Sequence, residues 1–400
     1  MKANPGGEIS PSDTVGRDKL INRLWETLAH QSVVLVSERR MGKTTVVKKM
    51  RLETPASIQA FYRDVENLDT PAEFVERVFQ DVETVLGRRQ RVAAKTRQLL
   101  QRLSGAELTG IVKFPEMLAP HWKVILEQAL RDLDEHHDRT TVFFWDEFPV
   151  MLHHITKVAG EVEAISLLDT LRHIRQSCNS IRMVFTGSIG LHHITTKLRH
   201  AGHTNDATND MRTLEVTELS YDDASWLAAE LIRGEGLNCA ELELTAQAIS
   251  SSVDRIPFYI HSVVAELKDR GDIADPHLVS TIVRDALVDP HDRWHLKHYF
   301  DRIGEYYGHN AHPLVLEMLD ELAVAHEPLN LPEWHQRVVR RLRMGKSALI
   351  DAVVEYDLDP MRQLIYLLER DHYIRRQATD GLLAFRFPLI QRWWRMFRML

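Results

Sequence analysis

The 400-residue sequence predicts an α/β core, with a mostly parallel sheet covered by helices on both faces, followed by two largely helical parts. In the first half of the chain, short apolar runs typical of strands alternate with segments whose apolar residues repeat at helical spacing. Such alternation predicts parallel strands in one sheet. After Leu214 the strand signal fades and helical spacing continues. We therefore expect three folded parts, at 14–214, 215–300 and 301–400.

The composition is typical of a soluble, cytoplasmic protein. Hydrophobic residues make up 44% and charged residues 27% of the chain, and no apolar run approaches the roughly 20 residues that a membrane span needs. Residues 1–13 are rich in Pro, Gly and Ser and lack the apolar stretch of a signal peptide, so we expect a disordered leader. Cys178 and Cys239 lack the spacing of a zinc or redox site and are expected to be reduced.

The expected elements of the core follow one another in order. Helical spacing occurs at about 18–29, 45–52, 71–102, 121–134 and 161–177. Strand patterns occur at 33–36, 58–65, 140–145 and 182–186. The first strand, VVLV, is an unbroken apolar run, which indicates burial on both faces. Residues 103–120 contain Gly, Pro and Ser and are expected to form a loop.

The second half of the chain has clear start and turn signals. Ser220 and Asp275 are N-cap residues that precede helical segments. Residues 373–387 have a hairpin pattern, with Asp380-Gly381 as the turn. Helices followed by a small hairpin are typical of a winged helix, which we expect within 301–400.

The segment between the first strand and the next helix, SERRMGKTT, predicts a phosphate-binding loop. Gly42, Lys43 and Thr44 fill the informative end of the pattern G-x-x-x-x-G-K-[ST]. Backbone N–H groups of the loop and of the helix N-terminus would bind the phosphates of ATP, and Lys43 would reach the β and γ phosphates. The predicted nucleotide-binding residues of the loop are Ser37, Glu38, Arg39, Arg40, Met41, Gly42, Lys43, Thr44 and Thr45. Ser37 replaces the first glycine, which leaves the rate of hydrolysis open.

Two carboxylates directly follow the apolar run at 140–145. A strand that ends in this way after a phosphate loop is typical of the Walker B motif. Asp146 would hold Mg²⁺ together with Thr44, and Glu147 would be the general base that activates the attacking water. We therefore predict Lys43 and Glu147 as catalytic residues, and ATP and Mg²⁺ as cofactors, in a P-loop NTPase core.

The strand at 182–186 ends next to further polar residues. Ser188 or Thr186 would lie near the γ phosphate if this strand adjoins the site, and a plain turn is an equal alternative. An activating arginine is not fixed by the sequence. The candidates are Arg172, Arg175 and Arg212.

Four segments together resemble the archaeal-type ATPases of the AAA+/STAND group. They are VGRDKL from Val15, VVLVSERRMGKTT from Val33, WDEFPVML from Trp145 and FTGSIG from Phe185. The resemblance implies a P-loop ATPase core, a helical lid that starts near 214–231, and a C-terminal winged helix.

The resemblance also implies further nucleotide contacts. Val15, Gly16 and Arg17 correspond to the family segment that lies near the adenine. Arg255-Ile256-Pro257 is similar to the family's G-x-P signature, so Pro257 would sense the nucleotide from the lid. In this chain Arg255 replaces the glycine of that signature.

These features favour an ATP-driven switch that controls a protein partner or a nucleic-acid transaction. The resemblance connects such switches with signalling and with defence against phage and mobile elements. The sequence identifies neither the partner nor the oligomeric state, and a homo-oligomer remains open.

Two other functions are compatible with the same motifs. The formal net charge is −7, but residues 334–400 carry 13 Lys/Arg against 7 Asp/Glu. A DNA-binding initiator or loader would use arginines of that part on phosphates; they are Arg337, Arg340, Arg341, Arg343, Arg375 and Arg376. A pseudo-ATPase scaffold, which binds nucleotide without turnover, is indicated by Ser37 and Arg255.

Overall fold

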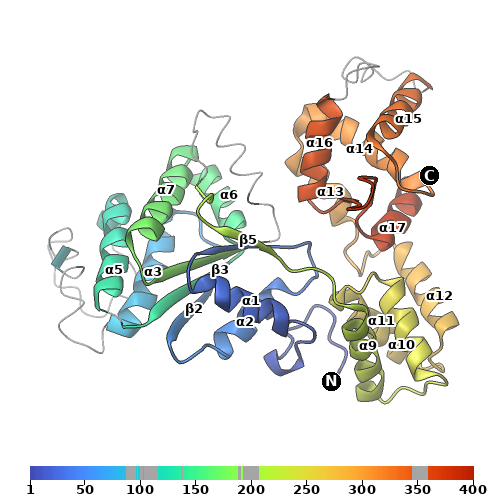
Figure 1. Ribbon diagram of the computed structural model, residues 1–400, viewed down its shortest axis with the longest axis horizontal. Helices are drawn as coiled ribbons and strands as arrows, with labels where there is room; N and C mark the ends of the chain where they lie inside the picture. The colour runs from blue at the N-terminus through green and yellow to red at the C-terminus, as the bar shows by residue number, and fades with distance from the viewer. Residues whose placement is uncertain are drawn as a thin grey trace. The chain divides into compact units, whose positions relative to one another are not determined.

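The computed structural model describes residues 1–86, 96, 98, 99, 102, 116–136, 138–187, 191, 207–344 and 359–400. The chain divides into two compact units (Figure 1). The first unit is Ser10–Val216, and the second combines Met1–Ile9 with Thr217–Leu400. No helix among the described residues is both long enough and apolar enough to span a membrane.

The first unit contains a five-stranded sheet in the order β2-β3-β4-β1-β5, and every neighbouring pair is parallel. The strands are β1 (Val33–Val36), β2 (Ile58–Asp64), β3 (Thr140–Asp146), β4 (Ile181–Thr186) and β5 (Arg212–Glu215). The prediction of a parallel α/β core is therefore confirmed. The sequence pattern misses β5, because its residues, RTLE, include one apolar side chain.

Helices cover both faces of this sheet (Figure 1). One face carries α1 (Asp18–Leu28) and α2 (Lys43–Leu52). The other face carries α3 (Pro71–Leu86), α5 (Trp122–His136), α6 (Phe148–Val158) and α7 (Glu161–Ser177). Two short 3-10 helices, η1 (Pro11–Asp13) and η2 (Glu116–His121), precede α1 and α5. The helix α6 was not predicted, although Pro149 at its start is a common first-turn residue.

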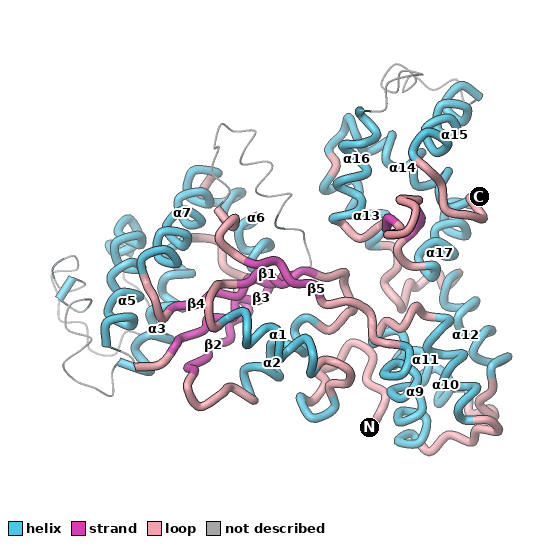
Figure 2. The backbone as a smooth tube through the Cα atoms, viewed as in Figure 1, coloured by secondary structure: helices cyan, strands magenta, loops and turns pink. Residues whose placement is uncertain are grey.

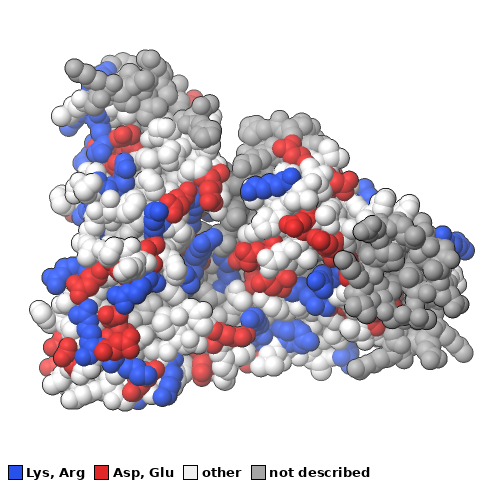
Figure 3. All heavy atoms as spheres, turned by 180° about the vertical axis from the view of Figure 1, so that it is seen from behind, with Lys and Arg blue, Asp and Glu red and all other residues white. Residues whose placement is uncertain are grey.

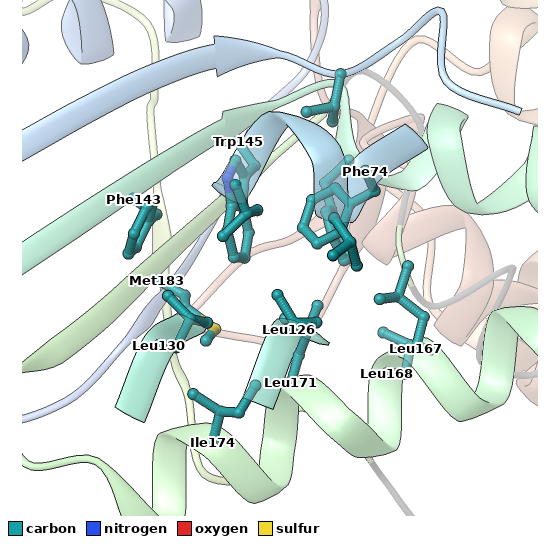
Figure 4. Close-up of a cluster of buried hydrophobic side chains, with 14 of the residues drawn as sticks. Phe74, Leu126, Leu130, Phe143, Trp145, Leu167, Leu168, Leu171, Ile174 and Met183 are labelled. Carbon is teal, nitrogen blue, oxygen red and sulfur yellow. The ribbon is translucent and has the colours of Figure 1, made fainter. Parts of the chain in front are cut away.

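The core on the α5 and α7 side fixes the end of β3. Figure 4 shows Phe143 and Trp145 of β3 near Leu126 and Leu130 of α5. Side chains alternate along a strand, so Phe144 faces α1 instead, where its ring lies edge-on to Trp25 at a centroid distance of 6.1 Å. Since β3 is packed on both faces, the residue that follows Trp145 has a well-defined position.

The second unit is mainly helical, and its named strands form one small hairpin (Figure 2). Its helices are α9 (Tyr221–Glu235), α10 (Leu242–Ser252), α11 (Pro257–Arg270), α12 (Pro276–Leu287), α13 (His298–Tyr306), α14 (Gly308–Val324), α15 (Leu331–Met344), α16 (Asp359–Arg370) and α17 (Pro388–Arg398). The hairpin consists of β6 (Ile374–Arg376) and β7 (Leu383–Phe385). Its predicted turn is confirmed, with Gly381 at a φ of 73°.

The two predicted helix starts in this unit are also present. Ser220 Oγ accepts the N–H of Asp223 at 3.1 Å, and Asp275 Oδ1 accepts the N–H of Leu278 at 2.7 Å. These bonds satisfy backbone donors that a helix N-terminus otherwise leaves open.

The leader that we expected to be disordered is ordered in the structure. The N–H of Ala3 donates to Glu235 Oε1 at 2.8 Å, and the N–H of Asn4 donates to His261 Nδ1 at 3.2 Å. Backbone donors of the leader thus find acceptors on α9 and α11. Composition misses this because it does not indicate which surface a polar segment will pack against.

A buried carboxylate connects three helices of the second unit. Asp320 of α14 accepts hydrogen bonds from Trp394 Nε1 at 2.8 Å, from Arg398 Nη2 at 2.8 Å and from Arg341 Nη2 at 3.1 Å. A buried charge is tolerated when it is paired and hydrogen-bonded. Trp394 and its neighbour Trp393 are both buried in the core of this unit.

A second carboxylate of this unit, Asp254, joins the turn before α11 to the start of α17. Its Oδ2 accepts the N–H of Leu389 at 2.7 Å. Burial raises the pKa of Asp254 to about 6, although the Leu389 N–H, Arg392 and Arg255 act in the opposite direction. The Asp254 carboxylate is therefore harder to ionise in the folded chain than in water.

We expect Asp254→Asn to change how stability depends on pH. Because the native pKa is raised from 3.8 to about 6, the folded state binds this proton more tightly than the unfolded state, so this group's contribution to the free energy of unfolding falls as pH rises across that window. Asparagine keeps an acceptor for Leu389 and does not titrate. The variant should gain up to about 3 kcal/mol relative to wild type between pH 4 and pH 7.

Urea unfolding at a series of pH values measures this difference. The control is Asp272→Asn, at an exposed aspartate of the same unit. If the free energy of unfolding of both variants depends on pH in the same way as that of wild type, the pKa of Asp254 is not raised in the folded chain.

Candidate phosphate-binding site

The candidate site residues lie at one edge of the parallel sheet. The loop at 37–42 joins β1 to α2, Asp146 ends β3 and Thr186 ends β4. Tyr62 lies near the same end of β2. Ligands of open parallel sheets bind outside the carboxyl ends of the strands, so the elements bring these side chains to the expected position.

The loop keeps its conformation without the first glycine of the motif. Left-handed backbone occurs at Arg40, with a φ of 70°, and at Gly42, with a φ of 87°, and Ser37 is not among the residues of positive φ. The Ser37 hydroxyl donates to the Glu38 carbonyl at 2.7 Å, and Glu38 Oε1 accepts the N–H of Arg39 at 2.7 Å. A serine is therefore compatible with this loop, because its position does not demand the freedom of glycine.

The end of the loop presents free backbone donors. The N–H groups of Gly42, Lys43, Thr44 and Thr45 have no hydrogen-bond partner among the described residues, and no side chain caps α2. The first bond of the helix is donated by the N–H of Val46 to the Gly42 carbonyl, at 3.0 Å. Successive free N–H groups at the positive end of a helix dipole form an anion site.

Lys43 adds a buried cation to these donors. Its ammonium group donates to the Ser37 carbonyl at 3.0 Å. Burial lowers the pKa of Lys43, whereas Glu147, Glu38 and Asp146 act to raise it. A phosphate group bound at the neighbouring N–H groups would compensate the desolvation of this ammonium directly.

Asp146 is the centre of the polar contacts at this edge. Its Oδ2 accepts the Thr44 hydroxyl at 2.7 Å and the Tyr62 hydroxyl at 3.2 Å. Its Oδ1 accepts the Glu147 N–H at 3.2 Å and the Thr186 hydroxyl. The carboxylate is buried, and four donors from α2, β2, β4 and the start of α6 hold it in place.

The residues present fit a magnesium ion. Thr44 and Asp146 supply a hydroxyl and a carboxylate oxygen 2.7 Å apart, next to the free N–H groups of α2. Mg²⁺ prefers oxygen ligands and is commonly held by one or two carboxylates together with substrate phosphates. Within the described part of the chain, no group of three or more acidic, His or Cys side chains could enclose a metal without such phosphates.

Glu147 occupies a strained position beside this carboxylate. It is the N-cap of α6, has a φ of 55° and is half-buried. A non-glycine residue in left-handed backbone costs of the order of 1 kcal/mol or more and is frequent at functional sites. Its carboxylate acts to raise the pKa of Lys43, which places Glu147 near the phosphate loop.

The predicted adenine segment contacts the loop through Arg17. The Arg17 side chain is buried, and its Nη2 donates to the Met41 carbonyl at 2.8 Å. Gly16 has a φ of 67°, and Val15 is half-buried. Arg17 thus stabilises the loop through the Met41 carbonyl. The predicted contact of this segment with adenine stays a prediction.

The segment predicted as a lid signature lies in the second unit. Pro257 is the first residue of α11, a common position for proline. Arg255 has a φ of 59°, a backbone conformation that glycine adopts more easily than other residues. In this chain Arg255 offsets that strain by donating to the Leu219 carbonyl at 3.0 Å and to Glu218 at 3.3 Å.

Two further predictions concern the end of β4. Ser188 lies outside the described residues, whereas Thr186 contacts Asp146 as described above. One of the candidate activating arginines, Arg175, has its partners within the first unit. It pairs with Asp210 at 2.8 Å and donates to the Ala207 carbonyl at 2.6 Å. Its side chain therefore supports the core and does not reach a bound phosphate.

Sequence reasoning missed Tyr62. The register pairs Tyr62 of β2 with Phe144 of β3, two residues before Asp146, and this brings the phenol to the carboxylate. Burial, and next the charge of Asp146, raise the pKa of Tyr62, so its hydroxyl remains a donor. The sequence does show a hydroxyl-bearing residue near the end of the predicted strand at 58–65. Its role can be inferred only when β2 is known to lie next to β3 in the sheet.

Comparison with solved structures identifies the same fold. A Walker-type ATPase of Pyrococcus abyssi matches with a TM-score of 0.64 at 14% identity, covering 99% of this chain and 100% of that chain. The α/β P-loop NTPase core with following helices is thus confirmed as the fold class. No family model matches the sequence, and no curated protein matches it.

Two other solved structures resemble the chain more distantly. The ORC2 protein of Aeropyrum pernix matches with a TM-score of 0.49 at 13% identity, covering 95% of this chain and 92% of that chain. The RuvB Holliday junction branch migration motor of Thermotoga maritima matches with a TM-score of 0.40 at 10% identity, covering 92% of each chain. Similarity at this level does not bear on function.

We expect Tyr62→Phe to weaken the affinity of the nucleotide site for Mg²⁺. The substitution removes one of two donors on Asp146 Oδ2, and a hydrogen bond of this kind contributes about 1 kcal/mol, which corresponds to roughly a fivefold change. The Mg²⁺ concentration for half-maximal binding of a fluorescent ATP analogue should rise about fivefold, while binding in EDTA should not change.

Tyr221→Phe is the matched control, because Tyr221 is exposed in the second unit. An equal loss of binding in EDTA would show that Tyr62 only stabilises the fold and does not position Asp146.

Proposed function

We propose that this chain binds and hydrolyses ATP and uses the nucleotide as a switch that controls a protein partner. The observation that supports this most directly is the buried Lys43 ammonium beside four free N–H groups, with Thr44 and Asp146 adjacent. Together they match the charge of a triphosphate with its magnesium ion. The shared fold with a Walker-type ATPase supports the same conclusion.

Each residue has a separate role in the proposed reaction. The N–H groups at 42–45 and Lys43 hold the phosphates and neutralise their charge, while Thr44 and Asp146 hold Mg²⁺. When bound, Mg²⁺ would supply further neutralisation of the phosphate charge. Glu147 takes a proton from the attacking water while the oxygen of that water forms a bond to the γ phosphorus. The bond between this phosphorus and the bridging oxygen breaks, and ADP and phosphate are released.

The switch function follows from what accompanies the core. The second unit carries the proposed lid at 215–300 and the proposed winged helix at 301–400. The proposed catalytic residues, Lys43 and Glu147, both lie in the first unit. Binding energy from the γ phosphate and its metal can shift a two-state element only through contacts that differ between the states. The resemblance to AAA+/STAND ATPases extends this proposal to defence or signalling, and to assembly with further copies of the chain.

The basic C-terminal part offers less support for a DNA loader. Several of its candidate arginines pair with carboxylates: Arg337 with Glu333 at 2.7 Å, Arg341 with Glu317 at 2.6 Å, and Arg376 with Glu369 at 3.1 Å. Paired arginines contribute less to phosphate binding. Lys and Arg are also interspersed with Asp and Glu over the face that Figure 3 shows. A protein partner therefore agrees better with these side chains.

We expect Glu147→Gln to separate binding from turnover. Glutamine has nearly the same shape but cannot accept the proton of the attacking water, and loss of a general base reduces rates about 10²- to 10⁴-fold. Steady-state phosphate release should fall by at least about 100-fold, while the Kd for ATP changes less than about threefold.

The matched control is Glu161→Gln, because Glu161 is an exposed glutamate in the first turn of α7. Equal phosphate release by Glu147→Gln and wild type would contradict the assigned base. Binding of ATP by wild type without phosphate release would instead indicate a nucleotide-binding scaffold.

A further inference from the structure

A groove of about 510 Å³ lies along the outer surface of α1 in the first unit and reaches Arg212 of β5. The residues of α1 that line it include Lys19, Arg23 and Glu26, which recur at helical spacing and form one exposed stripe. From Lys19 to Glu26 the helical rise of about 1.5 Å per residue gives the stripe a length of roughly 10 Å, and His30 lies in the turn after α1. The opposite side of α1 is packed into the core through Leu24 and Leu28.

The cations in this groove lack partners. The side chains of Lys19, Arg23 and Arg212 make no hydrogen bond or ion pair within the part of the chain that the structure describes. Lys19 and Arg23 are four residues apart on one helix, where like charges repel. The groove therefore concentrates three cations against a single carboxylate, Glu26. A ligand of opposite charge would relieve this repulsion.

We infer that the groove binds an acidic, extended segment of a partner protein. Three cations favour an acidic ligand, and the amides of Asn22 and Gln31 can each donate to and accept from a peptide backbone. At about 3.3 Å per residue, a stripe of roughly 10 Å accommodates about three extended residues.

Two observations favour a peptide over nucleic acid. Glu26 lies one helical turn after Arg23 in the same groove, where it would repel an unbroken row of phosphates but can pair with a basic or hydroxyl side chain of a peptide. The whole chain carries a net charge of −7, so attraction of an acidic ligand is confined to local sites such as this one. This inference rests on the proposed switch for the partner's role, while the groove can be tested without nucleotide.

The test uses the full chain and a fluorescein-labelled peptide of eight glutamates as the probe, followed by anisotropy. The groove variant is Lys19→Glu with Arg23→Glu. The control is Arg77→Glu with Lys157→Glu, which changes two exposed cations of α3 and α6 and alters the net charge equally. We expect the groove variant to bind the probe at least about 10-fold more weakly, and the control to stay within about twofold of wild type.

Three further measurements complete the test. Binding of the probe should weaken as salt rises, since the contacts are exposed charges, and both variants should bind an ATP analogue as wild type does. A 20-base-pair DNA duplex should not displace the probe from wild type. Light scattering should give the same molar mass for wild type and the groove variant.

Several results would overturn the inference. They are no binding of the probe by wild type, equal weakening in the groove and control variants, and displacement of the probe by the duplex. Loss of an oligomer in the groove variant would assign the groove to a second copy of this chain. If wild type binds the probe but not ATP, the proposed switch fails and the groove remains a peptide site.

Discussion

The carboxylate of Asp146 is where the elements around the candidate site meet. It accepts hydroxyl donors from α2, β2 and β4 and the N–H of Glu147 at the start of α6. Such a buried charge is stable only if its lone pairs are satisfied, so the ends of three strands and the start of α2 must keep their relative positions. The aromatic packing of Trp145 against Phe185, Phe148 and Phe74 gives the same end of β3 its rigidity.

A comparable arrangement occurs in the second unit. Asp254 and Arg255 are consecutive residues with positive φ, immediately before α11. One side chain holds the N–H of Leu389 and the other holds the Leu219 carbonyl. The strain of two left-handed residues is thus offset by contacts that join α17 and the segment before α9 to one turn. Because only Ile256 separates this turn from Pro257, the same contacts also position the start of α11.

Local signals were enough to predict most of the core. VVLV followed by GKTT, and FFW followed by two acids, specify strands, loop and carboxylates, because burial and phosphate chemistry each demand particular residues at those places. The strand β5 was missed because RTLE contains one apolar residue. The helix α6 was missed although Phe148, Met151, Leu152 and Ile155 recur at helical spacing, so its signal was present in the sequence. Tyr62, the ordered leader and the groove on α1 depend on which distant segments meet, and sequence spacing does not contain that information. The backbone conformation of Ser37 is one that serine adopts readily, while the rate of hydrolysis stays a prediction that phosphate release would test.

The proposed nucleotide site combines the free N–H groups of α2 with the Lys43 ammonium. Isothermal titration calorimetry of the full chain with ATP in the presence of Mg²⁺ tests this most directly, with Lys43→Ala as the variant and Lys157→Ala, at an exposed lysine of α6, as the control. Loss of a charge-assisted bond to phosphate costs about 3 kcal/mol, so the variant should bind at least about 100-fold more weakly and the control as wild type. Equal ATP binding by Lys43→Ala and wild type, or none by wild type, would contradict the account.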